Sequence, residues 1–288
     1  MSAIAARLFE WRSPSARRVG TIANSAVECL LLELETWPKP GLVSHVDRGS
    51  HDDMDADMFR ASAEAIAPYL DALVEAGARG SAMPALRLIG LDAEAAMLAA
   101  TSGINTHRGA IFGLGLLCAA AGARAAGRVD PPVSLGNAVA MLWGEDIREG
   151  PVLLHSHGSK ARLRFGAGGA RMEAARGFPS IYEVGLPALR RAANVRPRCH
   201  EAARVEACFA LIASLEDTNL LHRGGAPGLR FAQHAAQAFL QEGGVGGPRW
   251  RARALWVHES FIARRLSPGG SADLLAMTLF VDRHEGSR

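Results

Sequence analysis

The chain has 288 residues, of which 49% are hydrophobic and 21% are charged, values that are ordinary for a soluble globular protein. Its 32 basic and 29 acidic residues give a formal net charge of +3 at pH 7, which argues against a nucleic-acid-binding protein with a concentrated basic stripe. The N-terminal residues contain no long apolar stretch typical of a signal peptide. The longest apolar run, residues 109–123, is shorter than the ~20 residues of a membrane helix. We therefore expect a cytoplasmic protein that binds neither nucleic acid nor membrane.

The four cysteines lie far apart in the sequence, and no two of them form a CxxC pair. Cys29, Cys118 and Cys208 fall in apolar helical stretches, where cysteine behaves as a small hydrophobic residue. This spacing predicts neither a disulfide framework nor a zinc site.

Apolar residues recur with a helical period along most of the chain, and β-branched runs of strand length are nearly absent. In chain order, the expected helices cover residues 16–35, 54–77, 91–101, 106–127, 133–148, 199–217, 227–241, 249–266 and 271–283. Segments rich in glycine and proline separate many of them, and none is long enough to require a domain boundary. We predict an all-α fold: a single compact domain of about ten helices over residues 16–288, after an N-terminal tail of residues 1–15.

The first polar segment follows the first expected helix. A Pro-Lys-Pro-Gly turn surrounds Lys39, and its restricted backbone either holds the ammonium group at a site or only stops the helix. Four aspartates then occur within six residues, at positions 52, 53, 55 and 57. The dipole of a following helix accounts for some of them, but four adjacent carboxylates also suit a Mg²⁺ ion that shares substrate phosphates.

The second polar segment, GINTHRGAIF, places Asn105, Thr106, His107 and Arg108 at the start of the apolar helix over residues 106–127. Asn105 or Thr106 can cap the helix by accepting a hydrogen bond from a free backbone N–H. Capping needs only one of the four side chains. A helix N-terminus with added Arg and His is also a favourable place for a phosphate group.

Two further polar segments each have a structural explanation. Residues 156–180 are rich in glycine and carry five basic residues and Glu173, which suits either a loop that wraps a phosphate or an ordinary surface loop. In LSPGGSADLLAMTLF, Ser271 is a plausible N-cap and Asp273 lies in the first turn, which capping alone can explain.

The segment LEDTNLLHRGG is harder to explain by helix ends alone. If the helix over residues 199–217 continues, Thr218 and His222 share a face, and so do Asn219 and Arg223, so that polar side chains line a cleft beside the core. The alternative is a helix C-terminus before Gly-Gly, which accounts for the two basic residues but not for Asp217 and its neighbours.

Common nucleotide-binding and hydrolase signatures are missing. The sequence has no GxxxxGK[ST], no completed GxGxxG after a strand, no GxSxG and no HExxH. If the protein binds a triphosphate, helix ends, basic side chains and a metal ion must hold it.

Six motifs in order give the chain a specific resemblance. They are PKPGLV (38–43), GSHDDMD (49–55), GINTHRGAIFGLGLL (103–117), RGFPSIYEVGLPAL (176–189), DTNLLHRGG (217–225) and LSPGGSADLLAMTLF (266–280). Together they resemble the triphosphoribosyl-dephospho-CoA synthases, which act in prosthetic-group biosynthesis for malonate decarboxylase and citrate lyase. The wording of the motifs at 105–112 and 267–280 favours the malonate decarboxylase branch, whereas Trp37 departs from the family's usual small Thr or Ser before Pro-Lys-Pro.

This resemblance implies a specific reaction. ATP and 3′-dephospho-CoA would give 2′-(5″-triphosphoribosyl)-3′-dephospho-CoA and free adenine, so the glycosidic bond of ATP breaks and its phosphates stay intact. The product would pass to a phosphoribosyl-dephospho-CoA transferase that acts on the acyl carrier subunit. The family's product is α-linked and ATP is β-linked, which implies a single inverting displacement like that of an inverting glycosidase. A homodimer is compatible with the sequence, which does not fix the oligomeric state.

The resemblance also suggests roles for the polar residues. Lys39, His51, His107, Arg108, His222 and Arg223 would bind the substrate, chiefly by neutralising phosphates, and Asn105, Thr106 and Asn219 would hydrogen-bond ribose or base edges. Asp52, Asp53 and Asp217 would hold Mg²⁺ or act as general base, with Glu173 as a further catalytic carboxylate. Which carboxylate is the base stays open.

Two rival hypotheses belong to other classes. His51-Asp52 in an all-helical chain also suits an HD-type metal-dependent phosphohydrolase, with His45 and Asp217 completing the ligand set, but that hypothesis leaves the other motifs without a use. A non-catalytic helical adaptor has no need of five polar helix edges. One cleft lined by all five segments would favour the transferase, and scattered segments would favour the adaptor.

Overall fold

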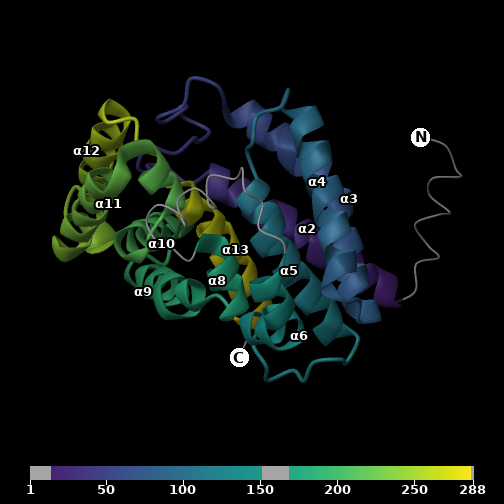
Figure 1. Ribbon diagram of the computed structural model, residues 1–288. Helices are drawn as coiled ribbons and strands as arrows, with labels where there is room; N and C mark the ends of the chain where they lie inside the picture. Colours follow the sequence, from purple (N-terminus) through teal and green to yellow (C-terminus); the bar gives the residue numbers. More distant parts are fainter. Residues whose placement is uncertain (1–13, 151–168, 287–288) are drawn as a thin grey trace, which may run out of the picture.

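The computed structural model describes residues 14–150 and 169–286, with side chains from residue 21 onward. Within these ranges the chain forms eleven α-helices, a π-helical turn and a short 3₁₀-helix, and no β-strand occurs there, which confirms the all-α prediction (Figure 1). None of these helices is both long and apolar enough to cross a lipid bilayer.

Five described helices precede residue 151. They are α2 (Pro14–Leu34), α3 (Ala56–Arg79), α4 (Met83–Ala100), α5 (Arg108–Ala125) and α6 (Leu135–Glu149). After residue 168 come α8 (Gly169–Ala175), the π-helical turn η1 (Ser180–Gly185), α9 (Leu186–Val195), α10 (His200–Ser214), α11 (Thr218–Gln241), the 3₁₀-helix η2 (Gly244–Gly246), α12 (Trp250–Ala263) and α13 (Gly269–Glu285).

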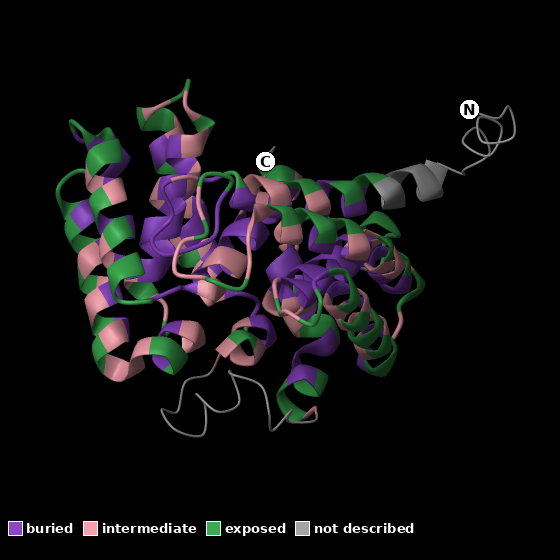
Figure 2. Cartoon of the chain, turned by 90° about the horizontal axis from the view of Figure 1, so that it is seen from above, coloured by how far each residue is buried: buried purple, intermediate pink, exposed green. Residues whose placement is uncertain are grey.

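Helix α5 packs against α2, α3, α4 and α6 and is buried along almost its whole length. Figure 2 shows that the buried residues gather in the interior of the molecule. The glycines and alanines of α5 let α3 approach closely, because a Cβ at Gly122 would overlap the backbone of Val74 and a Cβ at Gly77 would overlap the backbone of Ala119. Two helices can come this close only where side chains are absent or minimal. The apolar run of residues 109–123 is therefore a core helix, as the sequence predicts.

Helix α13 joins the two groups of helices. It packs against α2 and α5 on one side and against α10 and η1 on the other, and Figure 1 shows it in the middle of the molecule. Because its N-terminal residues reach the starts of both α5 and α11, segments far apart in the sequence meet at this helix.

Some predicted boundaries were wrong. Helix α4 begins at Met83, eight residues before the predicted start, because Pro84 suits the first turn of a helix. The predicted helix over residues 199–217 ends early and does not continue: α10 ends at Ser214, and α11 begins at Thr218 after Asp217 as its N-cap. The helical segment over residues 180–195 was not predicted either.

Candidate functional site

All five polar segments line one cleft of about 1170 Å³. Its walls come from α2, α3, α4, α5, α6, α8, α11 and α13 and from the loop before α3. Most of the predicted site residues contribute to it, namely His51, Asp53, Asn105, Thr106, His107, Arg108, Glu173, Asp217, Asn219, His222 and Arg223. Lys39 and Asp52 are not among the lining residues. Of residues 156–180, the part before residue 169 lies outside the described residues.

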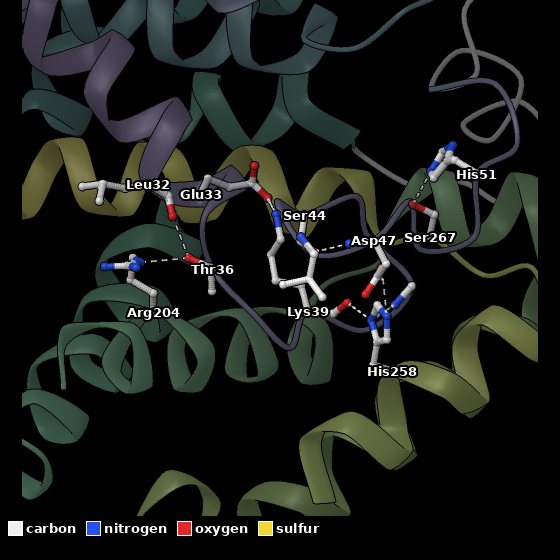
Figure 3. Close-up of polar contacts among 12 residues, drawn as sticks. Leu32, Glu33, Thr36, Lys39, Ser44, Asp47, His51, Arg204, His258 and Ser267 are labelled. Atoms are coloured by element: carbon white, nitrogen blue, oxygen red, sulfur yellow. Dashed lines mark hydrogen bonds and ion pairs between the residues drawn. The ribbon is translucent and has the colours of Figure 1, made fainter. Parts of the chain in front are cut away.

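His51 is the centre of a polar group at the mouth of the cleft. Its Nε2 atom lies 2.8 Å from the Ser267 hydroxyl (Figure 3). Its Nδ1 atom lies 3.4 Å from an Asp53 carboxylate oxygen. Burial and the nearby Arg223 charge lower the pKa of His51. The imidazole is therefore neutral at pH 7, with the Ser267 hydroxyl on one nitrogen and both the Asp53 carboxylate and the Arg223 guanidinium near the other.

Arg223 connects this mouth to α11. One guanidinium nitrogen donates to the backbone carbonyls of Ser50 and Arg265, each at 3.3 Å, and the other lies 3.1 Å from His51 Nδ1. The side chain is exposed, and two residues later α11 is kinked at Gly225, whose φ is 61°. A cation fixed by carbonyls at an open mouth is well placed to meet an anionic substrate.

Lys39 is fully buried and forms an ion pair with Glu33 at 2.5 Å, as Figure 3 shows. Its backbone carbonyl contacts Nδ1 of the buried His258, whose other nitrogen lies 3.2 Å from Asp47. The Pro-Lys-Pro turn thus holds an ammonium group in place, but it holds it behind Glu33, and Glu33 is the residue of the pair that lines the cleft. Sequence analysis did not identify Glu33 as a site residue.

The start of α5 carries a chain of hydrogen bonds. The Asn105 side-chain oxygen accepts from the Arg108 N–H at 3.1 Å, so the predicted capping by Asn105 is present. Thr106 donates to Ser62 at 2.7 Å, and Ser62 lies 2.6 Å from His107 Nδ1. Burial, together with the charge of Lys39, lowers the pKa of His107 to about 4. The ring is therefore uncharged at neutral pH in this environment, which does not favour the predicted role of His107 in neutralising a phosphate.

Two other predicted residues already have protein partners. Arg108 forms an ion pair with Glu94 at 2.9 Å and remains partly exposed on the cleft wall. Glu173 accepts the backbone N–H of Ser180 at 2.7 Å, and burial raises its pKa. Both side chains face the cleft with part of their hydrogen-bonding capacity in use.

Asp217 is buried and its carboxylate is occupied by protein donors. Oδ1 accepts the backbone N–H groups of Asn219 and Leu220, and Oδ2 accepts both the N–H and the hydroxyl of Ser271. One carboxylate therefore caps α11 and ties it to the start of α13. Because four protein donors occupy this carboxylate, the contacts do not favour the predicted role of Asp217 as metal ligand or general base.

The four clustered aspartates separate into different uses. Asp55 caps α3 through the Met58 N–H, and Asp57 forms a surface ion pair with Arg60. Asp52 is exposed and does not line the cleft, whereas Asp53 lies beside His51. In the described part of the chain, no group of three or more His, Cys, Asp or Glu side chains could hold a metal ion. The predicted ligand set of residues 52, 53 and 217 is therefore not assembled.

Asp273 on α13 is a cleft residue for which sequence analysis left capping as a sufficient explanation. Its carboxyl accepts the backbone N–H of Ala110, in the first turn of α5, rather than capping its own helix. A Cβ at Gly109 would overlap this carboxyl, so the Arg-Gly-Ala start of α5 is shaped to receive it. In the sequence, Gly109 was the only indication of this contact, and it could not be interpreted without knowing that Asp273 lies beside it.

Comparison with known proteins identifies the family. Residues 20–288 match the model of the CitG family, described as ATP:dephospho-CoA triphosphoribosyl transferase. The chain belongs to this family. It is 43% identical over 270 residues to a probable 2-(5″-triphosphoribosyl)-3′-dephosphocoenzyme-A synthase of Azotobacter vinelandii, covering 91% of each chain. No solved structure matches.

Other relatives of the transferase family give the same result. A probable 2-(5″-triphosphoribosyl)-3′-dephosphocoenzyme-A synthase of Stutzerimonas stutzeri is 40% identical over 292 residues, with 98% of this chain and 96% of the relative covered. A protein of Pectobacterium atrosepticum with the corresponding name, without the word probable, is 40% identical over 267 residues and covers 89% and 87%.

The rival hypotheses do not fit these findings. The phosphohydrolase ligand set requires His45, which is exposed, and Asp217, which is buried and occupied by protein donors. An adaptor would not gather five separate polar segments around one cleft. Family membership and the shared cleft both favour the transferase.

Proposed function

We propose that this protein transfers the triphosphoribosyl group of ATP to the ribose 2′-hydroxyl of 3′-dephospho-CoA and releases adenine. Family membership supports this reaction, and the single observation that carries it structurally is the cleft, on which the polar segments of the family-like motifs converge. A volume of about 1170 Å³ is large for a small-molecule site, as two nucleotide substrates require.

The wall of the cleft changes from polar to apolar, and this suggests how ATP lies in it. His51, Asn219, His222 and Arg223 contribute to the polar mouth, where charged phosphates would stay close to solvent. Phe112, Leu116, Phe178 and Met277 are among the apolar side chains that line the interior. An adenine ring stacks well on apolar and aromatic surface, so we place the triphosphate at the mouth and the base inside.

The attacking hydroxyl needs a proton acceptor, and we assign this role to His51. In the proposed step the 2′-hydroxyl oxygen attacks C1′ of the ATP ribose, the C1′–N9 bond breaks, and its electron pair leaves with adenine. The proton of the hydroxyl passes to the neutral imidazole, whose Nε2 already lies 2.8 Å from the hydroxyl of Ser267. Asp53 then stabilises the protonated ring.

We propose that Mg²⁺ enters the cleft with ATP and is not held in a protein site of its own. Mg²⁺ keeps several waters and substrate phosphate oxygens and needs only one or two carboxylates, which fits a cleft without a preassembled ligand group among the described residues. Asp53 is the predicted metal ligand that faces the cleft with an exposed side chain. When bound, the ion would offset phosphate charge.

We also propose the malonate decarboxylase branch as the destination of the product. The amino-acid sequences of the motifs at residues 105–112 and 267–280 support this branch. The product would then pass to a phosphoribosyl-dephospho-CoA transferase that modifies the acyl carrier subunit. Analytical ultracentrifugation would show whether this protein is a homodimer.

Product analysis tests the function directly. The protein is incubated with ATP, 3′-dephospho-CoA and Mg²⁺, and adenine, orthophosphate and pyrophosphate are quantified. We expect adenine in step with the loss of ATP, no release of phosphate, loss of activity with excess chelator, and recovery with Mg²⁺ or Mn²⁺. Phosphate as the main product would overturn the proposal, and full activity in excess chelator would overturn the role of the metal ion.

A further inference from the structure

We propose that Asp273 is the catalytic acid that protonates adenine as it leaves, an inference that rests on the proposed function. The departing purine needs a proton because its ring otherwise carries away the electron pair of the C1′–N9 bond as negative charge. His51 accepts a proton from the incoming hydroxyl and cannot at the same time donate one to adenine. The mechanism therefore requires a second group on the cleft wall.

The position of Asp273 fits this requirement. On one side, Asp273 lies against Gly109 and Ala110 at the start of α5. Met277, four residues later on the same face of α13, lines the apolar interior. Toward the mouth, Gly270 packs against Asp217, which adjoins Asn219. Asp273 therefore stands where the polar wall meets the apolar wall. In ATP the glycosidic bond joins the phosphate-bearing sugar to the base, so that bond would lie at the same boundary.

The surroundings of Asp273 favour the protonated form of its carboxyl. Burial raises its pKa well above the ordinary value, and the neighbouring carboxylates of Glu33 and Asp217 raise it further. The Ala110 N–H opposes this effect. A raised pKa favours the protonated carboxyl, which is the form that can donate a proton.

Asp273 also differs from the other buried carboxylate of the site. The oxygens of Asp217 accept from four protein donors, whereas the contact identified for Asp273 is one backbone N–H. It retains partial exposure, as a group on the wall of a cleft does. In the proposed step its proton moves to N7 of adenine while the C1′–N9 bond breaks. The proton that His51 took from the hydroxyl returns through water to restore Asp273, so one turnover moves one proton from the hydroxyl to adenine.

The test combines Asp273→Asn with ATP analogues that lack one ring nitrogen. With ATP we expect the variant to lose about 10²–10⁴-fold in kcat. With 7-deaza-ATP, which has no N7 to protonate, the wild-type enzyme should lose a similar factor and the variant should lose little more. With 3-deaza-ATP, which keeps N7, the full effect of the substitution should remain. Asp282→Asn, at an exposed ion pair on the same helix, is the matched control and should retain wild-type turnover.

A second variant probes the same contact from α5. Gly109→Ala introduces a Cβ that overlaps the Asp273 carboxyl, so we expect at least a tenfold loss of turnover with ATP and little further loss with 7-deaza-ATP. Gly90→Ala on α4 is its control: Gly90 also lines the cleft, but the added Cβ has no atom within 4 Å apart from its chain neighbours and the backbone of its own helix. The thermal unfolding midpoint of each variant shows whether the fold is retained.

The outcomes separate the role of Asp273 from the function itself. If the wild-type protein releases no adenine from ATP and dephospho-CoA, the proposed function fails and the role of Asp273 fails with it. If the wild type is active and Asp273→Asn matches its turnover, only the role of Asp273 is overturned. Equal losses for this variant on ATP and on 7-deaza-ATP would also overturn it, because the substitution would then act independently of N7.

Discussion

The starts of α5 and α11 look alike in the sequence but are built differently. Each combines amide, hydroxyl, imidazole and guanidinium groups in a few residues, and each faces the cleft. At α11 the cap is local: Asp217 precedes the helix and accepts two of its free N–H groups. At α5 the Asn105 oxygen accepts the Arg108 N–H, and the carboxyl that accepts the Ala110 N–H in the same turn comes from Asp273 on α13.

This difference shows that polar residues at a helix start do not reveal their use by type. The carboxylate at the start of α11 stabilises the fold and connects two helices, so little capacity remains for chemistry. The carboxyl at the start of α5 comes from the distant helix α13 and can still form further hydrogen bonds. We infer that the α11 start contributes rigidity and a basic mouth, and that the α5 start forms the wall on which the reaction occurs.

The largest expected effect concerns the base at the mouth. His51→Ala should lower kcat by about 10²–10⁴-fold, because the incoming hydroxyl loses its proton acceptor. The exposed His45 in the same loop offers a control, and His45→Ala should behave as wild type. Steady-state adenine release measures both. Unchanged turnover in His51→Ala would move the base elsewhere in the cleft.

The next effect compares the two arginines, one at each helix start. Arg223→Ala and Arg108→Ala should each cost about 2–4 kcal/mol in transition-state stabilisation, the range for losing one partner of a desolvated charge pair, as judged from kcat/KM for ATP. Their melting temperatures should change little, because both side chains lie on the cleft and outside the core. Unfolding of both variants would mean that the arginines serve the structure.

A pH effect on stability should come from the α5 start. The pKa of His107 falls to about 4 in the folded protein, against an ordinary value of 6.5. The unfolded chain therefore binds a proton below about pH 6.5 that the folded chain takes up only near pH 4, so the stability contribution is complete above 6.5 and is lost as the pH falls to 4. The loss amounts to about 3 kcal/mol for a shift of this size.

Urea unfolding at pH 7 and at pH 4.5 measures this dependence. His107→Gln should reduce it, because the amide does not titrate and can still meet Ser62. Burial and the charges of Arg124 and Arg283 also lower the pKa of His284 to about 4. We therefore expect His284 to account for the pH dependence that remains in His107→Gln. An identical pH dependence in His107→Gln and wild type would contradict the assignment.

The smallest effect is a structural one at α11. Asp217→Asn replaces one carboxylate oxygen by an amide nitrogen that cannot accept, so either the helix N–H groups or Ser271 lose their acceptor. We expect a loss of about 1–3 kcal/mol in the free energy of unfolding. Asp55→Asn, a cap at the less buried start of α3, should cost less. An equal cost at both caps would remove the distinction that we draw for Asp217.

The sequence predicts the all-α fold well because apolar periodicity determines which face of each helix is buried, as along α5. It also identifies the five polar segments that meet at the cleft. It fails where the outcome depends on a distant partner. The charge of His107 depends on burial against Ser62 and on Lys39, and the availability of Asp217 depends on Ser271, 54 positions away. No local pattern encodes such pairings.

The position of α13 has a consequence for the order of events during synthesis. This helix follows the other described helices in the chain, so the ribosome makes α5 and α11 before it makes Asp273 and Ser271. Until then Asp217 lacks the donors that hold its second oxygen, and the wall of the cleft at Gly109 lacks its carboxyl. A nascent chain that stops before residue 269 would thus present an incomplete pocket, and binding of ATP would begin only when the last described helix docks between the two groups.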